Sequence, residues 1–114
     1  MTVSIDGSVG ILAPAVFLSV PITVTASTYT MASAQTSFIF NGTGTIVVTL
    51  PSAATYLGQI IFVKTVPAQA VISASSNVVL ISSLTAQTNI LAATAGKWAI
   101  MQSNGTNWVV MASN

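Results

Sequence analysis

Only three side chains of this chain carry a charge at neutral pH: Asp6, Lys64 and Lys97. Charged residues make up 3% of the sequence, whereas about a quarter of the residues of an average globular protein are charged. Hydrophobic residues make up 53%, and a net charge of +1 favours association of copies over repulsion between them. We therefore expect partner chains to cover part of the surface of this protein.

The shortage of ionisable groups also limits the chemistry of the chain. It has no His and no Cys, so a Ser–His triad and a transition-metal site both lack their usual ligands or bases. A Ser–Lys pair built on Lys64 or Lys97 is the catalytic alternative, and the competing interpretation is a lysine that lies along an apolar surface or interface. We predict that the protein is not an enzyme and holds no cofactor and no metal ion.

Nucleic acids and membranes are also disfavoured as partners. Phosphate contacts come mainly from Arg and Lys, of which this chain has two in all. The longest apolar stretch, residues 9–24, is interrupted by Pro14 and Pro21 and falls short of the ~20 residues of a membrane-spanning helix. Asp6 stands where a secretory signal would carry positive charge. We expect no nucleic-acid partner and no membrane partner.

The order of apolar and polar residues predicts strands throughout the chain. Residues 20–26 alternate with period two, and residues 37–40 and 45–50 suggest a hairpin across the glycine-rich turn 41–44. A further strand is expected at residues 59–66, and the clearest hairpin joins residues 97–103 to 108–112. We predict an all-β protein with almost no helix: a compact antiparallel β-sandwich or barrel-like module over residues 21–114.

Three predicted strands are apolar on both faces, at residues 60–66, 98–101 and 108–112. In a lone two-sheet sandwich of this size the outer faces should be polar, so we interpret the pattern as cover supplied by neighbouring subunits. An enlarged core is the alternative interpretation.

Two segments are candidates for contacts with partners. Residues 1–20 are either an arm that packs on a neighbouring protein or the first strand of the domain, and its apolar side chains are the predicted contacts: Ile11, Leu12, Val16, Phe17 and Leu18. The second candidate is the turn of the last predicted hairpin, an exposed loop made of Asn104, Gly105, Thr106 and Asn107.

Four segments together carry a resemblance to a known family. They are residues 41–54 (NGTGTIVVTLPSAA), 58–64 (GQIIFVK), 73–79 (SASSNVV) and 90–108 (ILAATAGKWAIMQSNGTNW). Residues 22–114 resemble a β module of bacteriophage tail-fibre and other virion structural proteins, and the string from Gly96 to Trp108 is the most distinctive part. The resemblance implies a homotrimer of β-rich subunits with a structural role in the virion.

Because the β module is nearly the whole chain and no shaft accompanies it, we expect a small capsid cement, decoration or head-fibre protein. Its partners would be its own copies and other virion proteins, the major capsid protein first among them. The alternative is a receptor-binding tip or tail-fibre module of the phage tail. A host-side adhesin or surface-layer protein is a third class, and it would need a secretory signal.

Overall fold

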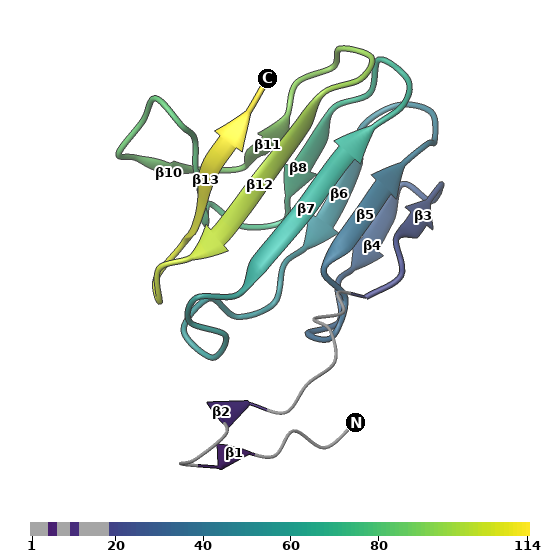
Figure 1. Ribbon diagram of the computed structural model, residues 1–114. Helices are drawn as coiled ribbons and strands as arrows, with labels where there is room; N and C mark the ends of the chain where they lie inside the picture. The colour runs from purple at the N-terminus through teal and green to yellow at the C-terminus, as the bar shows by residue number, and fades with distance from the viewer. Residues whose placement is uncertain (1–4, 7–9, 12–18) are drawn as a thin grey trace.

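The computed structural model describes residues 5–6, 10–11 and 19–114, and these residues form strands and no helix (Figure 1). The strands are β1 (Ile5–Asp6), β2 (Gly10–Ile11), β3 (Ile22–Val24), β4 (Thr28–Thr30), β5 (Ser37–Phe40), β6 (Ile46–Thr49), β7 (Ile60–Thr65), β8 (Val71–Ser73), β9 (Val78–Val79), β10 (Ala86–Gln87), β11 (Asn89–Leu91), β12 (Trp98–Ser103) and β13 (Trp108–Ser113). The all-β prediction is confirmed.

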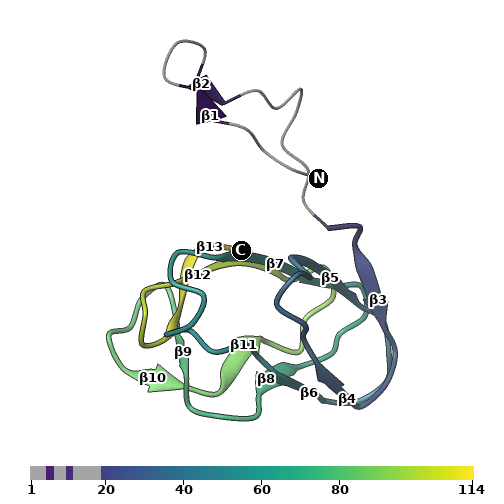
Figure 2. The same cartoon turned by 90° about the horizontal axis from the view of Figure 1, so that it is seen from below.

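Two sheets pack face to face, as the view in Figure 2 shows most clearly. The larger sheet has seven strands in the order β10-β9-β13-β12-β7-β5-β3, and the smaller has four in the order β11-β8-β6-β4. The strand orders of the two sheets are aligned with each other. The edge strands β3 and β4 therefore lie at one end of the sandwich, and the edge strands β10 and β11 lie at the other. The predicted sandwich of two layers is therefore present.

The strand directions differ from the predicted antiparallel arrangement. From β3 to β8 the chain crosses between the sheets at every step, so β3, β5 and β7 run parallel in one sheet and β4, β6 and β8 in the other. The pairing of β13 with β9 is also parallel. Antiparallel pairing joins β7 to β12, β12 to β13, β8 to β11 and β9 to β10. The sandwich thus contains both parallel and antiparallel pairs of strands. Its first half, from β3 to β8, winds like a solenoid.

The predicted hairpin of residues 37–40 and 45–50 is wrong, because β5 and β6 lie in different sheets. Residues 41–44 form a corner between the two layers. The buried amide of Gln69 fixes this corner, since its Oε1 accepts a hydrogen bond from the Gly42 N–H at 3.2 Å and its Nε2 donates to the Gly44 carbonyl at 2.8 Å. A β-carbon on Gly42 would lie 2.7 Å from the carbonyl oxygen of Thr25, so successive corners stack too closely for any side chain there.

The last predicted hairpin is confirmed as β12 and β13. The side chain of Asn104 shapes its turn by accepting hydrogen bonds from the N–H groups of Thr106 and Asn107, at 3.0 and 2.8 Å. Gly105 adopts a φ of 90°, a conformation in which glycine avoids the strain of other residues. A bulge lies opposite Ile100 and Met101.

The core lies between the sheets and contains mainly aromatic and aliphatic side chains. Its largest fully buried members include Trp108, Phe38, Phe40, Ile46, Ile61 and Met101. Tyr29 packs edge-on against Phe38 with ring centroids 5.9 Å apart, which joins the two sheets near β3 and β4. The strand predicted at residues 20–26 is shorter than expected: Val24 is buried and Thr23 exposed, but Val20 already lies in solvent.

The N-terminal part of the chain contributes a separate two-stranded sheet. β1 pairs with β2, and within the described residues neither strand pairs with the sandwich. Of the five predicted contact residues, Ile11 belongs to β2, whereas Leu12, Val16, Phe17 and Leu18 lie outside the described residues. No helix in the described part of the chain could span a membrane.

Candidate interaction surface

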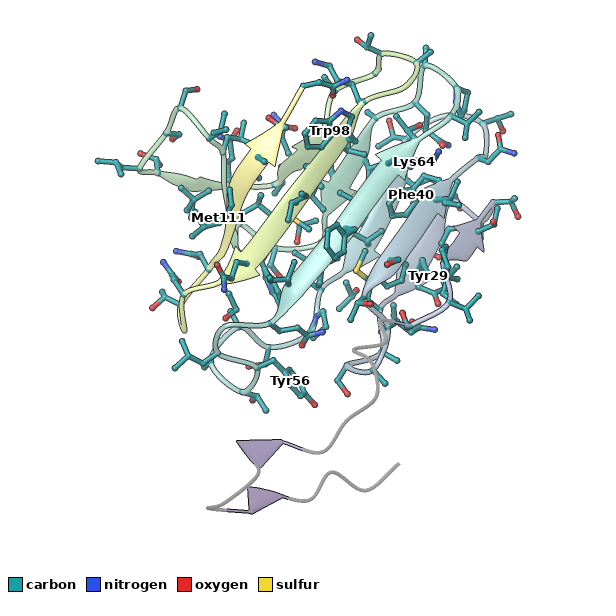
Figure 3. The ribbon with its side chains drawn as sticks, in the orientation of Figure 1. Tyr29, Phe40, Tyr56, Lys64, Trp98 and Met111 are labelled. Atoms are coloured by element: carbon teal, nitrogen blue, oxygen red, sulfur yellow. The ribbon has the colours of Figure 1, made fainter. Side chains whose placement is uncertain are left out.

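The outer face of the seven-stranded sheet carries aligned apolar side chains. Burial alternates along β7 and β12, so Phe62 and Ile100 point outward, and the register places them opposite each other. The next row of outward side chains across these strands centres on Lys64 of β7. Its cross-strand partners are Ile39 of β5 and Trp98 of β12. Figure 3 shows Lys64 and Trp98 side by side on this face. At the lower end of β7, Ile60 is 41% exposed and faces Gln102.

A hollow of about 380 Å³ lies on this face, over β5, β7 and β12. We call it the sheet hollow, and it is lined by Pro21, Ser37, Phe38, Ile39, Phe62, Val63, Lys64, Trp98, Ala99 and Ile100. Trp98 at its rim is 39% exposed, a large fraction for an indole on a sheet. Ser37, Lys64 and the indole N–H of Trp98 are its polar side-chain groups, and its other side chains are apolar, so the sheet hollow suits a mainly apolar occupant.

The two lysines differ in their surroundings. Lys97 donates a hydrogen bond from Nζ to the carbonyl oxygen of Asn114 at 2.8 Å. Lys64 is exposed, and it extends from the apolar rows of the sheet. Ser37 lines the same hollow, but across residues 19–114 no hydrogen bond joins a serine hydroxyl to either lysine.

The outer face of the four-stranded sheet has a different character. Thr28 and Thr30 of β4 are exposed, and Thr30 lies beside Thr49 of β6, which is exposed as well. Hydroxyl groups therefore cover much of this face, although Val47 and Ile72 remain half-buried there. The sequence suggested apolar residues on both faces of several strands, and these strands all belong to the seven-stranded sheet.

The loop between β9 and β10 forms a second apolar feature. Its tip holds Leu84, which is fully exposed at 101% of its reference surface. Hydrogen bonds define the turn: the Ser83 N–H donates to the carbonyl of Leu80 at 3.0 Å, and the Thr85 N–H donates to the Ser83 hydroxyl at 3.0 Å. We call residues 81–85 the leucine turn. Sequence reasoning missed it, although two large aliphatic residues around a Ser-Ser pair in a short linker could have indicated it.

The predicted exposed loop lies close to the leucine turn. Asn104 and Thr106 are exposed, and Gly105 and Asn107 are half-buried. Asn104 and Asn107 help to line a hollow of about 510 Å³ between this loop, β13 and the leucine turn. Met111, which is 58% exposed, forms part of its wall. The structure thus brings together amide groups and an apolar wall at this end of the sandwich.

The described residues contain no group of three or more His, Cys, Asp or Glu side chains that could hold a metal ion. Comparison of the sequence with protein-family models and with curated proteins gives no match. The surface chemistry of the sandwich is therefore the basis for assigning a role.

Proposed function

We propose that this protein is a structural component of a bacteriophage virion that assembles as a homotrimer and binds other virion proteins. The observation that carries the proposal is the apolar outer face of the seven-stranded sheet, where Phe62, Ile100 and Trp98 surround a single lysine. On this face Ile60 and Trp98 are exposed while Phe62 and Ile100 are half-buried, and apolar patches on a protein surface are candidate sites of protein association. With 3% charged residues, the chain also lacks the repulsion that keeps copies of ordinary soluble proteins apart.

The resemblance of residues 22–114 to β modules of virion proteins supports the placement in a virion. Within the particle, we assign the protein to the capsid as a cement, decoration or head-fibre protein. The apolar residues of the N-terminal segment would then contact the major capsid protein, each burying apolar area at ~25 cal/mol per Å². In this proposal the outer face of the seven-stranded sheet mediates self-association, and the N-terminal segment attaches the protein to the capsid.

A receptor-binding tip is the second candidate function, and one observation favours it. The hollow beside Met111 combines the amides of Asn104 and Asn107 with an apolar wall. A few polar groups on an apolar background are typical of sites that orient a small ligand, such as a glycan of the host surface.

Binding to particles that lack the protein tests the proposal. In the full chain, we expect the double substitution Phe17→Asp and Leu18→Asp to abolish particle binding while leaving the oligomer intact. Thr49→Asp, on the threonine-rich face of the smaller sheet, is the control and should bind like the wild type. Wild-type protein that ignores particles but binds host cells, and loses this binding with Asn107→Ala, would replace the capsid role by the receptor-binding role.

A further inference from the structure

The leucine turn holds an apolar side chain away from the molecule. Single exposed apolar residues are common on protein surfaces, but Leu84 stands on a turn whose backbone is fixed by hydrogen bonds from Ser83 and Thr85. The turn projects from the β9–β10 end of the sandwich, on the side opposite β3 (Figure 1). The hydrogen bonds thus hold the backbone of Leu84 in place, so that its side chain forms an exposed apolar knob.

The sheet hollow has the size and chemistry to receive such a knob. An enclosed cavity of about 150 Å³ lined by Leu, Ile and Phe holds a benzene molecule, and the sheet hollow is an open depression of about 380 Å³, which a leucine side chain can enter from outside. Phe62, Ile39 and Ile100 supply its apolar floor. The hollow lies over β5, β7 and β12, whereas the leucine turn lies beyond β13 and β9, so one copy cannot fill its own hollow.

We infer that Leu84 of one copy packs into the sheet hollow of a second copy. The inference rests on the self-association proposed above and specifies its interface. Because the knob and the hollow are different surfaces, the contact is heterologous, and its repetition gives a ring when the rotation between copies closes, as the proposed trimer requires. Any closed ring, a ring of three copies included, pairs every leucine turn with a sheet hollow.

Charge favours this arrangement over a face-to-face dimer. Two copies that packed hollow against hollow would bring their Lys64 ammonium groups together, and the sequence has a single carboxylate side chain, Asp6, to compensate. The leucine turn, in contrast, contains only Ile, Ser, Leu and Thr. Its hydroxyl groups and carbonyls can face Lys64 without repulsion and can accept hydrogen bonds from its ammonium group.

Two full-length variants and their mixture test the interface. Leu84→Asp removes the knob, and Ile100→Asp places a charge in the hollow; each side chain points outward, so the fold should survive both changes. Loss of a buried leucine contact weakens an interface by about 100-fold, so each variant alone should run as a monomer in light scattering. The mixture should form a complex of two chains, since one intact knob and one intact hollow remain. Leu57→Asp, at another exposed leucine, should keep the wild-type mass.

The outcomes separate this inference from the proposed function. If Leu84→Asp keeps the wild-type oligomer, the knob is wrong while self-association stands. If both variants are monomers and their mixture stays monomeric, the contact is not heterologous, and the inference is overturned. If the wild type is itself a monomer, self-association and its interface both fail. Circular dichroism spectra that match the wild type ensure that a monomer reflects a lost contact and not an unfolded chain.

Discussion

The indole Nε1 of Trp108 donates a hydrogen bond to the carbonyl oxygen of Pro51, 2.9 Å away, in the interior of the sandwich. The bond joins the first residue of β13 to the loop after β6 and therefore links the two sheets across the core. Trp108 is fully buried, and Pro51 is buried as well. This pair positions the hairpin that closes the solenoid half of the molecule.

Trp108→Phe should destabilise the fold, because the Pro51 carbonyl would stay buried without its donor. The expected loss is about 1–3 kcal/mol for the unpaired group, with an additional cost for the space left by the smaller ring. Urea unfolding measures it as a lower midpoint with an unchanged slope. Tyr56→Phe is the control, since Tyr56 is 37% exposed and lies in a surface loop. An equal effect of both substitutions would show that the hydrogen bond to Pro51 contributes nothing.

Gln69→Leu should also destabilise the fold. The substitution keeps the size of the side chain but leaves the Gly42 N–H and the Gly44 carbonyl without their partner. We expect a loss of about 1–3 kcal/mol, mainly from the half-buried Gly42 N–H, because Gly44 is exposed and water can bond to its carbonyl. Gln87→Leu changes a half-buried glutamine of β10 and should alter the free energy of unfolding by about 0.5 kcal/mol or less. A stable Gln69→Leu variant would contradict the role of this amide in the corner.

Gly42 and Gly44 should respond differently to substitution. Gly44 has a φ of 72° and open space around its α-carbon, so Gly44→Asn should be milder than Gly44→Ala, because asparagine tolerates this conformation better. At Gly42 the obstacle is the Thr25 carbonyl, so Gly42→Asn should be at least as harmful as Gly42→Ala. Thermal unfolding of the four variants provides the comparison. If the Asn variant is more stable than the Ala variant at both positions, close stacking of the corners is not the reason that residue 42 is glycine.

Local sequence was enough to predict the last hairpin but not the winding of the first half. Residues 104–107 contain everything that their turn needs, because Asn104 bonds to residues two and three positions later. Residues 41–44 have a similar composition, yet their conformation depends on Gln69, 27 residues beyond Gly42. A corner and a hairpin produce the same local pattern of strand, glycine-rich turn and strand. The choice between them is made by long-range contacts that the pattern does not contain.

The same limit applies to the interaction surface. Consecutive apolar residues along 60–66 and 98–101 correctly indicated apolar side chains on both faces, since outward Phe62 and Ile100 alternate with buried Ile61 and Met101. The hollow that these residues share arises from the cross-strand register, which single strands do not reveal. The leucine turn escaped notice because an isolated leucine in a linker has no period from which exposure can be inferred.

Salt should leave the oligomer intact. Interfaces held by ion pairs weaken when the ionic strength rises from about 50 mM to about 1 M, because charges are screened over a few ångströms. The proposed interface is apolar and contains one lysine per copy, so we expect the same mass at both salt concentrations, and a stronger assembly in sulfate. Light scattering measures the mass at each salt concentration. Dissociation at about 1 M NaCl would contradict an apolar interface.

The molar mass of the purified protein in solution tests the central claim most directly. Multi-angle light scattering at micromolar concentration should give three times the chain mass of 11.6 kDa for the wild type. The apolar face of the seven-stranded sheet would then be covered by neighbouring copies, as the account requires. A mass of 11.6 kDa under the same conditions would contradict it, because the face would remain in water without a partner.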